Sequence, residues 1–202
     1  MKNILLINIK NSKSDSLPSD WENFLVRNKG LIFYSDKNIS LISKIKKILA
    51  NDTFIFTESE ISFYSSINNK ILDLNEISNI YFYSINKINK EIKNGKLTPL
   101  TDSCFTIYDS SSNKLYLYSS CCGSGTIYYT SSEKGTFFAT HTSFLSKLRC
   151  YSISTSGISE IIRFGANYSS QTLLNELFKL PLASSLYIKD EVIIGNRSYY
   201  SK

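Results

Sequence analysis

Four short runs of apolar, aromatic and β-branched residues in the second half of the chain constrain the fold more than any other feature. They occupy residues 104–108, 115–118, 126–129 and 136–140. Such residues favour the half-buried surface of a β-sheet. Turn-forming residues separate the runs, because positions 109–113 hold only Asp, Ser and Asn, and Gly135 ends the last connection. The pattern predicts a close succession of strands.

Helix signals lie before these strands. Apolar side chains at positions 41, 42, 45, 48 and 49 predict a helix over Leu41–Leu49, with its lysines facing solvent. Asp73 stands three residues before Glu76, and this capping pair predicts the start of a second helix over residues 77–85.

Signals of both kinds continue to the end of the chain. Ser156 is expected to cap a third helix, and Gly165 is expected to end it in a left-handed conformation. Further strands are expected at residues 4–9, at 53–56 and 61–64 as one hairpin, and at 184–188 and 192–194 as another. Strands thus alternate irregularly with helices, which favours an α+β sandwich over a doubly wound parallel sheet.

Length and charge exclude several classes of protein. A chain of 202 residues with 42% hydrophobic content can bury roughly 70% of its unfolded surface, so a single domain over residues 1–202 is expected. The first apolar run, Ile4–Ile9, is too short for a signal peptide or a membrane span, which predicts a cytoplasmic protein without a membrane partner. The net charge of +6 comes from scattered lysines without an arginine-rich run, so no nucleic-acid partner is expected.

From about Cys104 onward, the order of the motifs resembles the second half of a known domain. The motifs are Gly123-Ser-Gly-Thr-Ile-Tyr-Tyr-Thr, Gly135-Thr-Phe-Phe-Ala-Thr-His-Thr-Ser-Phe-Leu, Ile158-Ser-Glu-Ile-Ile-Arg-Phe-Gly and Gln171-Thr-Leu-Leu-Asn-Glu-Leu-Phe-Lys-Leu-Pro. Together they are similar to the glutaminase domain of asparagine synthetase and its relatives, which include lasso-peptide macrolactam cyclases and beta-lactam synthetases. The resemblance implies a four-layer αββα sandwich of the N-terminal-nucleophile hydrolase type, with two antiparallel sheets between helical layers.

The residues that perform glutamine hydrolysis in that family are missing here. The family attacks the substrate amide with an N-terminal cysteine, whereas residue 2 is Lys, which predicts a mature chain that begins at Met1. The Asn-Gly-Glu loop is most nearly Glu58-Ser-Glu60, and the Asp that meets the substrate's amino group is most nearly Asp73. Ser154-Thr-Ser-Gly157 lacks the second glycine and the aspartate of the family's ATP loop and is interpreted as a helix cap. No catalytic, cofactor-binding or metal-binding residue is therefore expected.

The resemblance implies a catalytically inactive glutaminase-like domain that supports an ATP-dependent amide-bond-forming synthetase. That partner is expected on another chain or beyond residue 202, and in the branch that cyclises peptides to macrolactams in natural-product biosynthesis a peptide substrate is a further partner. The alternative is a free-standing module that binds a protein or a peptide without a synthetase.

A third hypothesis is different chemistry at a cysteine or at the single histidine, His141. The four cysteines lack the spacing of zinc sites and the density of a disulfide scaffold. The adjacent Cys121 and Cys122 precede a glycine turn and could be redox-active or bind a soft metal. Without further ligands nearby, they are interpreted as loop thiols, and Cys104 and Cys150 as buried packing.

Overall fold

The computed structural model describes most of the chain. The described residues are 4–10, 17–28, 30–50, 52–57, 62–67, 69–73, 76–77, 85–100, 103–120, 125–167, 169–189 and 192–198. Sequence predictions that involve Lys2, residues 58–60, Cys121 and Cys122 lie outside them.

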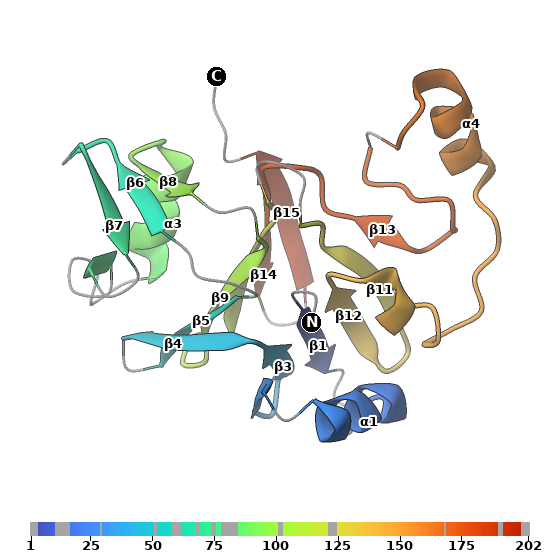
Figure 1. The fold of residues 1–202 in the computed structure, drawn as a ribbon, viewed down its shortest axis with the longest axis horizontal. Coiled ribbons are helices and arrows are strands. Elements are labelled where there is room, and N and C mark those ends of the chain that lie inside the picture. Colours follow the sequence, from blue (N-terminus) through green and yellow to red (C-terminus); the bar gives the residue numbers. More distant parts are fainter. Residues whose placement is uncertain are drawn as a thin grey trace.

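Two six-stranded antiparallel sheets form the centre of the molecule (Figure 1). The first has the order β13-β11-β12-β1-β3-β2, with bounds Phe178–Lys179, Tyr128–Ser132, Gly135–Ala139, Leu5–Lys10, Ile39–Ser43 and Ile32–Ser35. The second has the order β15-β14-β10-β9-β5-β4, with bounds Val192–Ser198, Ser184–Lys189, Lys114–Tyr118, Phe105–Asp109, Thr53–Thr57 and Ile45–Ala50. Most of the strands expected from the sequence are therefore present.

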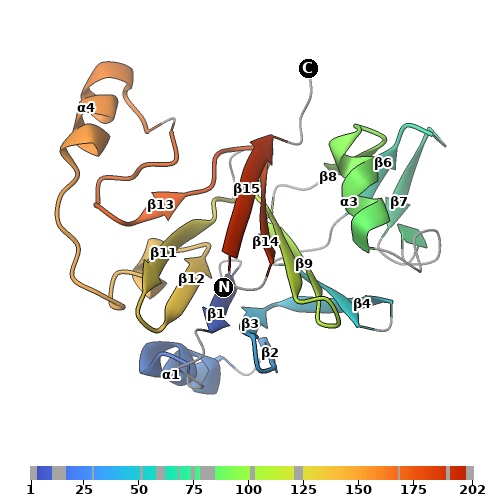
Figure 2. The same cartoon turned by 180° about the vertical axis from the view of Figure 1, so that it is seen from behind.

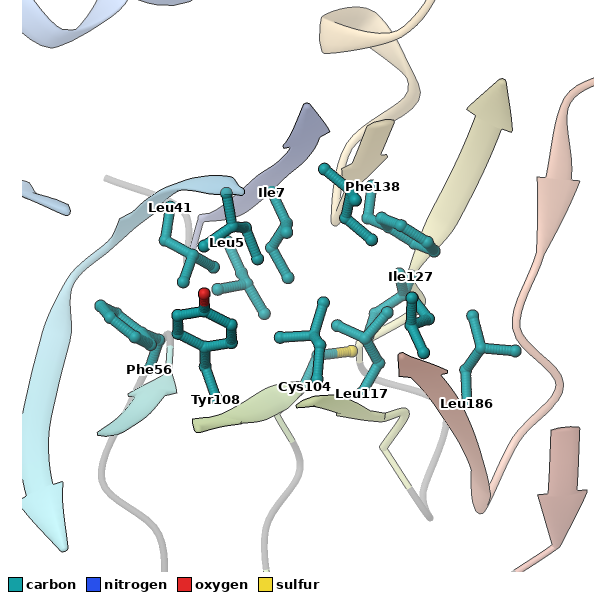
Figure 3. Close-up of a cluster of buried hydrophobic side chains, with 14 of the residues drawn as sticks. Leu5, Ile7, Leu41, Phe56, Cys104, Tyr108, Leu117, Ile127, Phe138 and Leu186 are labelled. Atoms are coloured by element: carbon teal, nitrogen blue, oxygen red, sulfur yellow. The ribbon is translucent and has the colours of Figure 1, made fainter. Parts of the chain in front are cut away.

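The two sheets pack face to face through one apolar cluster. Alternate residues of β1, Leu5 and Ile7, point into it from the first sheet, and Phe56, Tyr108 and Leu117 meet them from the second (Figure 3). Successive side chains of a strand point to opposite faces of the sheet, so the β1 residues next to these two point to the outer face. Burial of this cluster removes apolar surface from water and is the main force that holds the sheets together.

The outer face of the second sheet is covered by a small third sheet and a helix. The third sheet has the order β7-β6-β8, with bounds Lys70–Asp73, Ser62–Ser65 and Leu97–Leu100, and α3 spans Ile85–Lys93. Ile88 and Ile92 of α3 pack with Phe63 of β6 against Phe105 and Tyr118 of the second sheet. Figures 1 and 2 show this unit on the side of the molecule away from α4.

The outer face of the first sheet is covered by α1, which spans Ser19–Arg27. Trp21 is fully buried against Phe137 of β12, and their rings meet edge to face at 5.8 Å between centroids. Leu145 follows the short 3₁₀ turn η1, Thr142–Phe144, and joins the same cluster.

The expected α+β class and four-layer αββα sandwich are wrong. Strands dominate the described residues, which contain three α-helices with defined bounds, each of nine or ten residues. Among the described residues, neither outer face carries a helical layer, because one is covered by α1 and loops and the other by a third sheet with a single helix. The architecture is a mostly β fold built on two antiparallel sheets.

The predicted helix over Leu41–Leu49 is also wrong. The segment forms β3 and β4, which belong to different sheets, with Lys44 between them. Leu41 and Ile42 are both fully buried because one enters the cluster between the sheets and the other the cluster under α1. A strand covered on both faces has adjacent apolar residues, and this pattern imitated one face of a helix.

The predicted helix cap at Asp73 and Glu76 is present, whereas one predicted strand pairing is not. Asp73 and Glu76 form the predicted reciprocal cap, since Glu76 N donates to Asp73 Oδ1 at 2.8 Å and Asp73 N donates to Glu76 Oε2 at 3.0 Å. Most of the predicted helix that follows lies outside the described residues.

The strands at 53–56 and 61–64 exist, but β5 pairs with β4 and β9 whereas β6 pairs with β7 and β8, so the predicted hairpin is wrong.

The turn between β9 and β10 is held by one carboxylate. Asp109 Oδ1 accepts from Ser111 Oγ at 2.6 Å and from Ser111 N at 3.1 Å, and Asp109 Oδ2 accepts from Ser112 Oγ at 2.5 Å. Burial by itself would raise the pKa of the Asp109 carboxyl, but these hydrogen bonds outweigh it and hold the pKa below its usual value.

Asp109→Asn is expected to lower the free energy of unfolding by about 1–2 kcal/mol at neutral pH, because the charged acceptor is lost. A depressed folded-state pKa stabilises the protein above the unfolded value of about 3.9, and this contribution disappears as the pH falls through the folded pKa. Urea unfolding of both proteins across that range should show the difference shrinking in acid. A difference that stays constant with pH, or one equally present in the exposed control Asp52→Asn, would contradict the assignment.

In the part of the chain that the structure describes, no helix is both long and apolar enough to cross a bilayer.

Candidate binding site on the α4 arm

Helix α4 stands away from the two sheets, on a segment that leaves and rejoins the first sheet (Figures 1 and 2). It spans Thr155–Phe164. Its start is capped by Ser154, whose Oγ accepts from Gly157 N at 3.1 Å, and not by Ser156 as predicted. Gly165 ends it with φ 75°, as predicted. Residues 152–167 and 169–178 are called the α4 arm below.

The inner side of α4 packs tightly on the returning segment. Gly157 is the one residue of the helix that is buried, and a Cβ placed on it would lie 2.0 Å from the carbonyl oxygen of Thr172. Glu160 accepts hydrogen bonds from Ser169 N at 2.8 Å and from Ser169 Oγ at 2.9 Å, and Asn167 Nδ2 donates to the carbonyl of Gly157 at 2.9 Å. Close backbone approach and polar contacts, rather than apolar packing, therefore hold α4 in place.

The arm also carries exposed apolar side chains. Ile162 is 78% exposed and Ile153 67% exposed. The remaining exposed apolar residues of the arm are Ile158, Phe164, Leu173 and Phe178. Ile158 and Ile162 of α4 are thus both at the surface. These six residues are called the α4 apolar surface below.

A cavity of about 530 Å³ opens between the start of α4 and the returning segment. Its lining combines hydroxyl groups, two carboxamides, one carboxylate and three apolar side chains. These residues are Ser152, Ser154, Ser156, Gln171, Thr172, Leu174, Asn175, Glu176, Leu177 and Phe178. The size lies within the range of small-molecule sites. Sequence reasoning missed Gln171 and Asn175, because residues in irregular segments produce no periodic signal.

The residues singled out from the sequence do not come together. Cys104 is fully buried between the sheets, whereas Cys150 is exposed just before the arm, so the expectation of a buried Cys150 is wrong. His141 lies next to η1 in a half-buried position. Asp73 serves as a helix cap. Within the described ranges, no three His, Cys, Asp or Glu residues form a group that could hold a metal ion.

The most perturbed ionisable groups form a separate cluster around Asp36. Its Oδ2 accepts from Tyr108 Oη at 2.8 Å and from Tyr34 Oη at 3.1 Å. Burial, followed by the charge of Asp36, raises the pKa of Tyr34 to about 12. Burial and the bond to Asp36 raise the pKa of Tyr108 further above its ordinary value. Both phenols stay protonated at neutral pH, and they tie β2 to the second sheet.

Comparison with models of known protein families finds no match, and no curated protein matches the chain. The similarity to glutaminase domains therefore stays a prediction.

Proposed function

We propose that this chain is a non-catalytic cytoplasmic domain that supports an ATP-dependent amide-bond-forming synthetase by binding it through the α4 apolar surface. The observation that carries the proposal is the exposure of that surface, three of whose six residues lie on a helix held away from the sheets. Single exposed apolar residues are ordinary, but six in one short arm are typical of an interaction surface. The sequence similarity supplies the partner class, since α4 and the segment after it lie within the resembling motifs.

The helix is suited to this role because it is fixed by contacts other than its most exposed apolar side chain. Gly157, Glu160 and Asn167 fix α4 through its inner side, and Ile162, which is 78% exposed, contributes little to packing. A partner that covers them removes apolar surface from water at about 25 cal/mol per Å². Hydrophobic anchors of this kind dominate the affinity of many interfaces.

The test is co-purification with a tagged ATP-dependent synthetase whose gene lies next to the gene of this chain. The affinity is then measured by titration of one purified protein with the other. Ile162→Asp is expected to weaken binding by at least about tenfold, because a carboxylate replaces a buried anchor at the interface. The melting temperature should not change, since the side chain is 78% exposed. The matched control is Val26→Asp, which changes a residue 75% exposed on α1 and should leave binding intact. Equal effects of the two variants, or a chain indifferent to the synthetase, would contradict the proposal.

The second candidate function is a free-standing module that binds another protein or a peptide. The observation in its favour is the fold itself, because the absence of helical layers from the described residues departs from the architecture that the resemblance implies. In the same co-purification, an unrelated partner that is lost on Ile162→Asp, with no synthetase recovered, would favour this module.

A further inference from the structure

The cavity of the α4 arm is polar, yet most of its polar atoms already have partners. Thr172 Oγ1 donates to or accepts from three backbone groups, at Leu174 O, Leu174 N and Leu177 O. Ser154 Oγ is engaged by Gly157 N and by Ser156 Oγ. The hydroxyl groups of Thr172 and Ser154 thus shape the cavity rather than offer hydrogen bonds to a ligand.

Each of the two carboxamides, Gln171 and Asn175, uses only one of its two polar atoms in hydrogen bonds within the arm. Asn175 Nδ2 donates to Ser152 Oγ at 2.9 Å and to the carbonyl of Ile153 at 3.1 Å. Because a carbonyl can only accept, this bond fixes the orientation of the amide and leaves Oδ1 without a hydrogen bond from the described residues. Gln171 Oε1 accepts from Ser156 Oγ at 2.5 Å, which leaves Nε2 as an available donor.

The surroundings of these two atoms restrict the charge of a ligand. Glu176 lies on the lining and pairs with Arg149, so the lining of the cavity carries neither an unpaired anion nor an unpaired cation. An anionic ligand is disfavoured there because its charge would lose water without a cation of the lining to pair with it. Leu174, Leu177 and Phe178 supply the apolar part of the lining.

One NH₂ donor and one carbonyl acceptor beside an apolar wall are the complement of an amide group with an apolar neighbour. We infer that the cavity of the α4 arm binds a neutral amide-bearing ligand, an internal segment of a peptide, whose carbonyl accepts from Gln171 Nε2 and whose N–H donates to Asn175 Oδ1. An apolar side chain of the ligand packs against Leu174 and Phe178. Binding in the cavity needs no synthetase, and it goes beyond the docking proposed for the α4 apolar surface.

The experiment uses the ¹⁵N-labelled full chain and three small probes: N-acetyl-leucinamide, N-acetyl-leucine and glucose. N-acetyl-leucinamide is expected to shift the side-chain amide signals of Gln171 and Asn175 in a saturable manner, with millimolar affinity as is ordinary for so small a ligand. N-acetyl-leucine carries a carboxylate and should bind at least about fivefold more weakly, because no cation of the lining compensates the desolvation of its charge. No saturable shift with N-acetyl-leucinamide, or an equal response to glucose, would overturn the inference.

The decisive variant is Gln171→Glu, which keeps the oxygen that accepts from Ser156 and replaces the donor by a second acceptor. It is expected to weaken N-acetyl-leucinamide binding about tenfold, since a carbonyl then faces a carboxylate. The control is Ser159→Ala, an exposed residue of α4 outside the lining, which should bind as the parent chain does. Parent-like affinity of Gln171→Glu would show that the two carboxamides do not form the site.

Discussion

Trp21→Ala is expected to lower the free energy of unfolding by about 3–5 kcal/mol, the largest effect of any single substitution considered for this chain. The indole is fully buried, its ring packs edge to face on Phe137, and its Nε1 donates to the carbonyl of Phe144 at 3.1 Å. Removal of the ring leaves a cavity between α1 and the first sheet and an unsatisfied carbonyl at Phe144. The measurement is urea unfolding followed by far-ultraviolet circular dichroism, because Trp21 is the only tryptophan and the variant has no indole fluorescence.

Two substitutions calibrate this result. Trp21→Phe keeps much of the apolar volume and loses the hydrogen bond, so a smaller cost of about 1–3 kcal/mol is expected. Val26→Ala, on the same helix at an exposed position, should stay within about 0.5 kcal/mol of the parent chain. If Trp21→Ala cost no more than Val26→Ala, α1 would not be packed on the first sheet as described.

Gly157→Ala is expected to separate α4 from the returning segment of the arm. The new Cβ would lie 2.0 Å from the oxygen and 2.9 Å from the carbon of the Thr172 carbonyl, so the backbone has to move. Overpacking of this kind costs about 1–3 kcal/mol, whereas the change from Gly to Ala in an open helix gains about 1 kcal/mol from helix propensity. The sign of the effect therefore reports whether the close approach exists.

The separation should be local, because Asn167 and Ser169, which hold α4 by hydrogen bonds, belong to the arm itself. Hydrogen exchange of the α4 amides is expected to quicken while that of β1 stays unchanged. Binding of N-acetyl-leucinamide should be lost together with the cavity. Ser159→Ala introduces the same residue into the same helix without the clash, so slowed or unchanged exchange is expected there. Protection of α4 in Gly157→Ala equal to that of the parent would contradict the packing.

Sequence reasoning succeeded where a few neighbouring residues decide the structure. Gly165 ends α4, Asp73 and Glu76 cap each other, and the strands predicted at 184–188 and 192–194 pair antiparallel as β14 and β15. It failed at Leu41–Leu49, where the same apolar spacing suits a helix face or a strand buried on both sides. It also failed to find Gln171 and Asn175 as residues of the cavity, since their spacing does not show which amide atoms lack a hydrogen-bond partner.

The sequence by itself determined where the chain turns and caps, because those choices depend on the conformational preferences of single residues and on hydrogen bonds that span three or four positions. Tertiary structure alone decided which sheet each strand joins, what covers the outer faces, and that Ile162 lies at the surface while Gly157 is buried. These outcomes depend on contacts between residues far apart in the chain, and the free energy of such contacts cannot be inferred from a local sequence pattern.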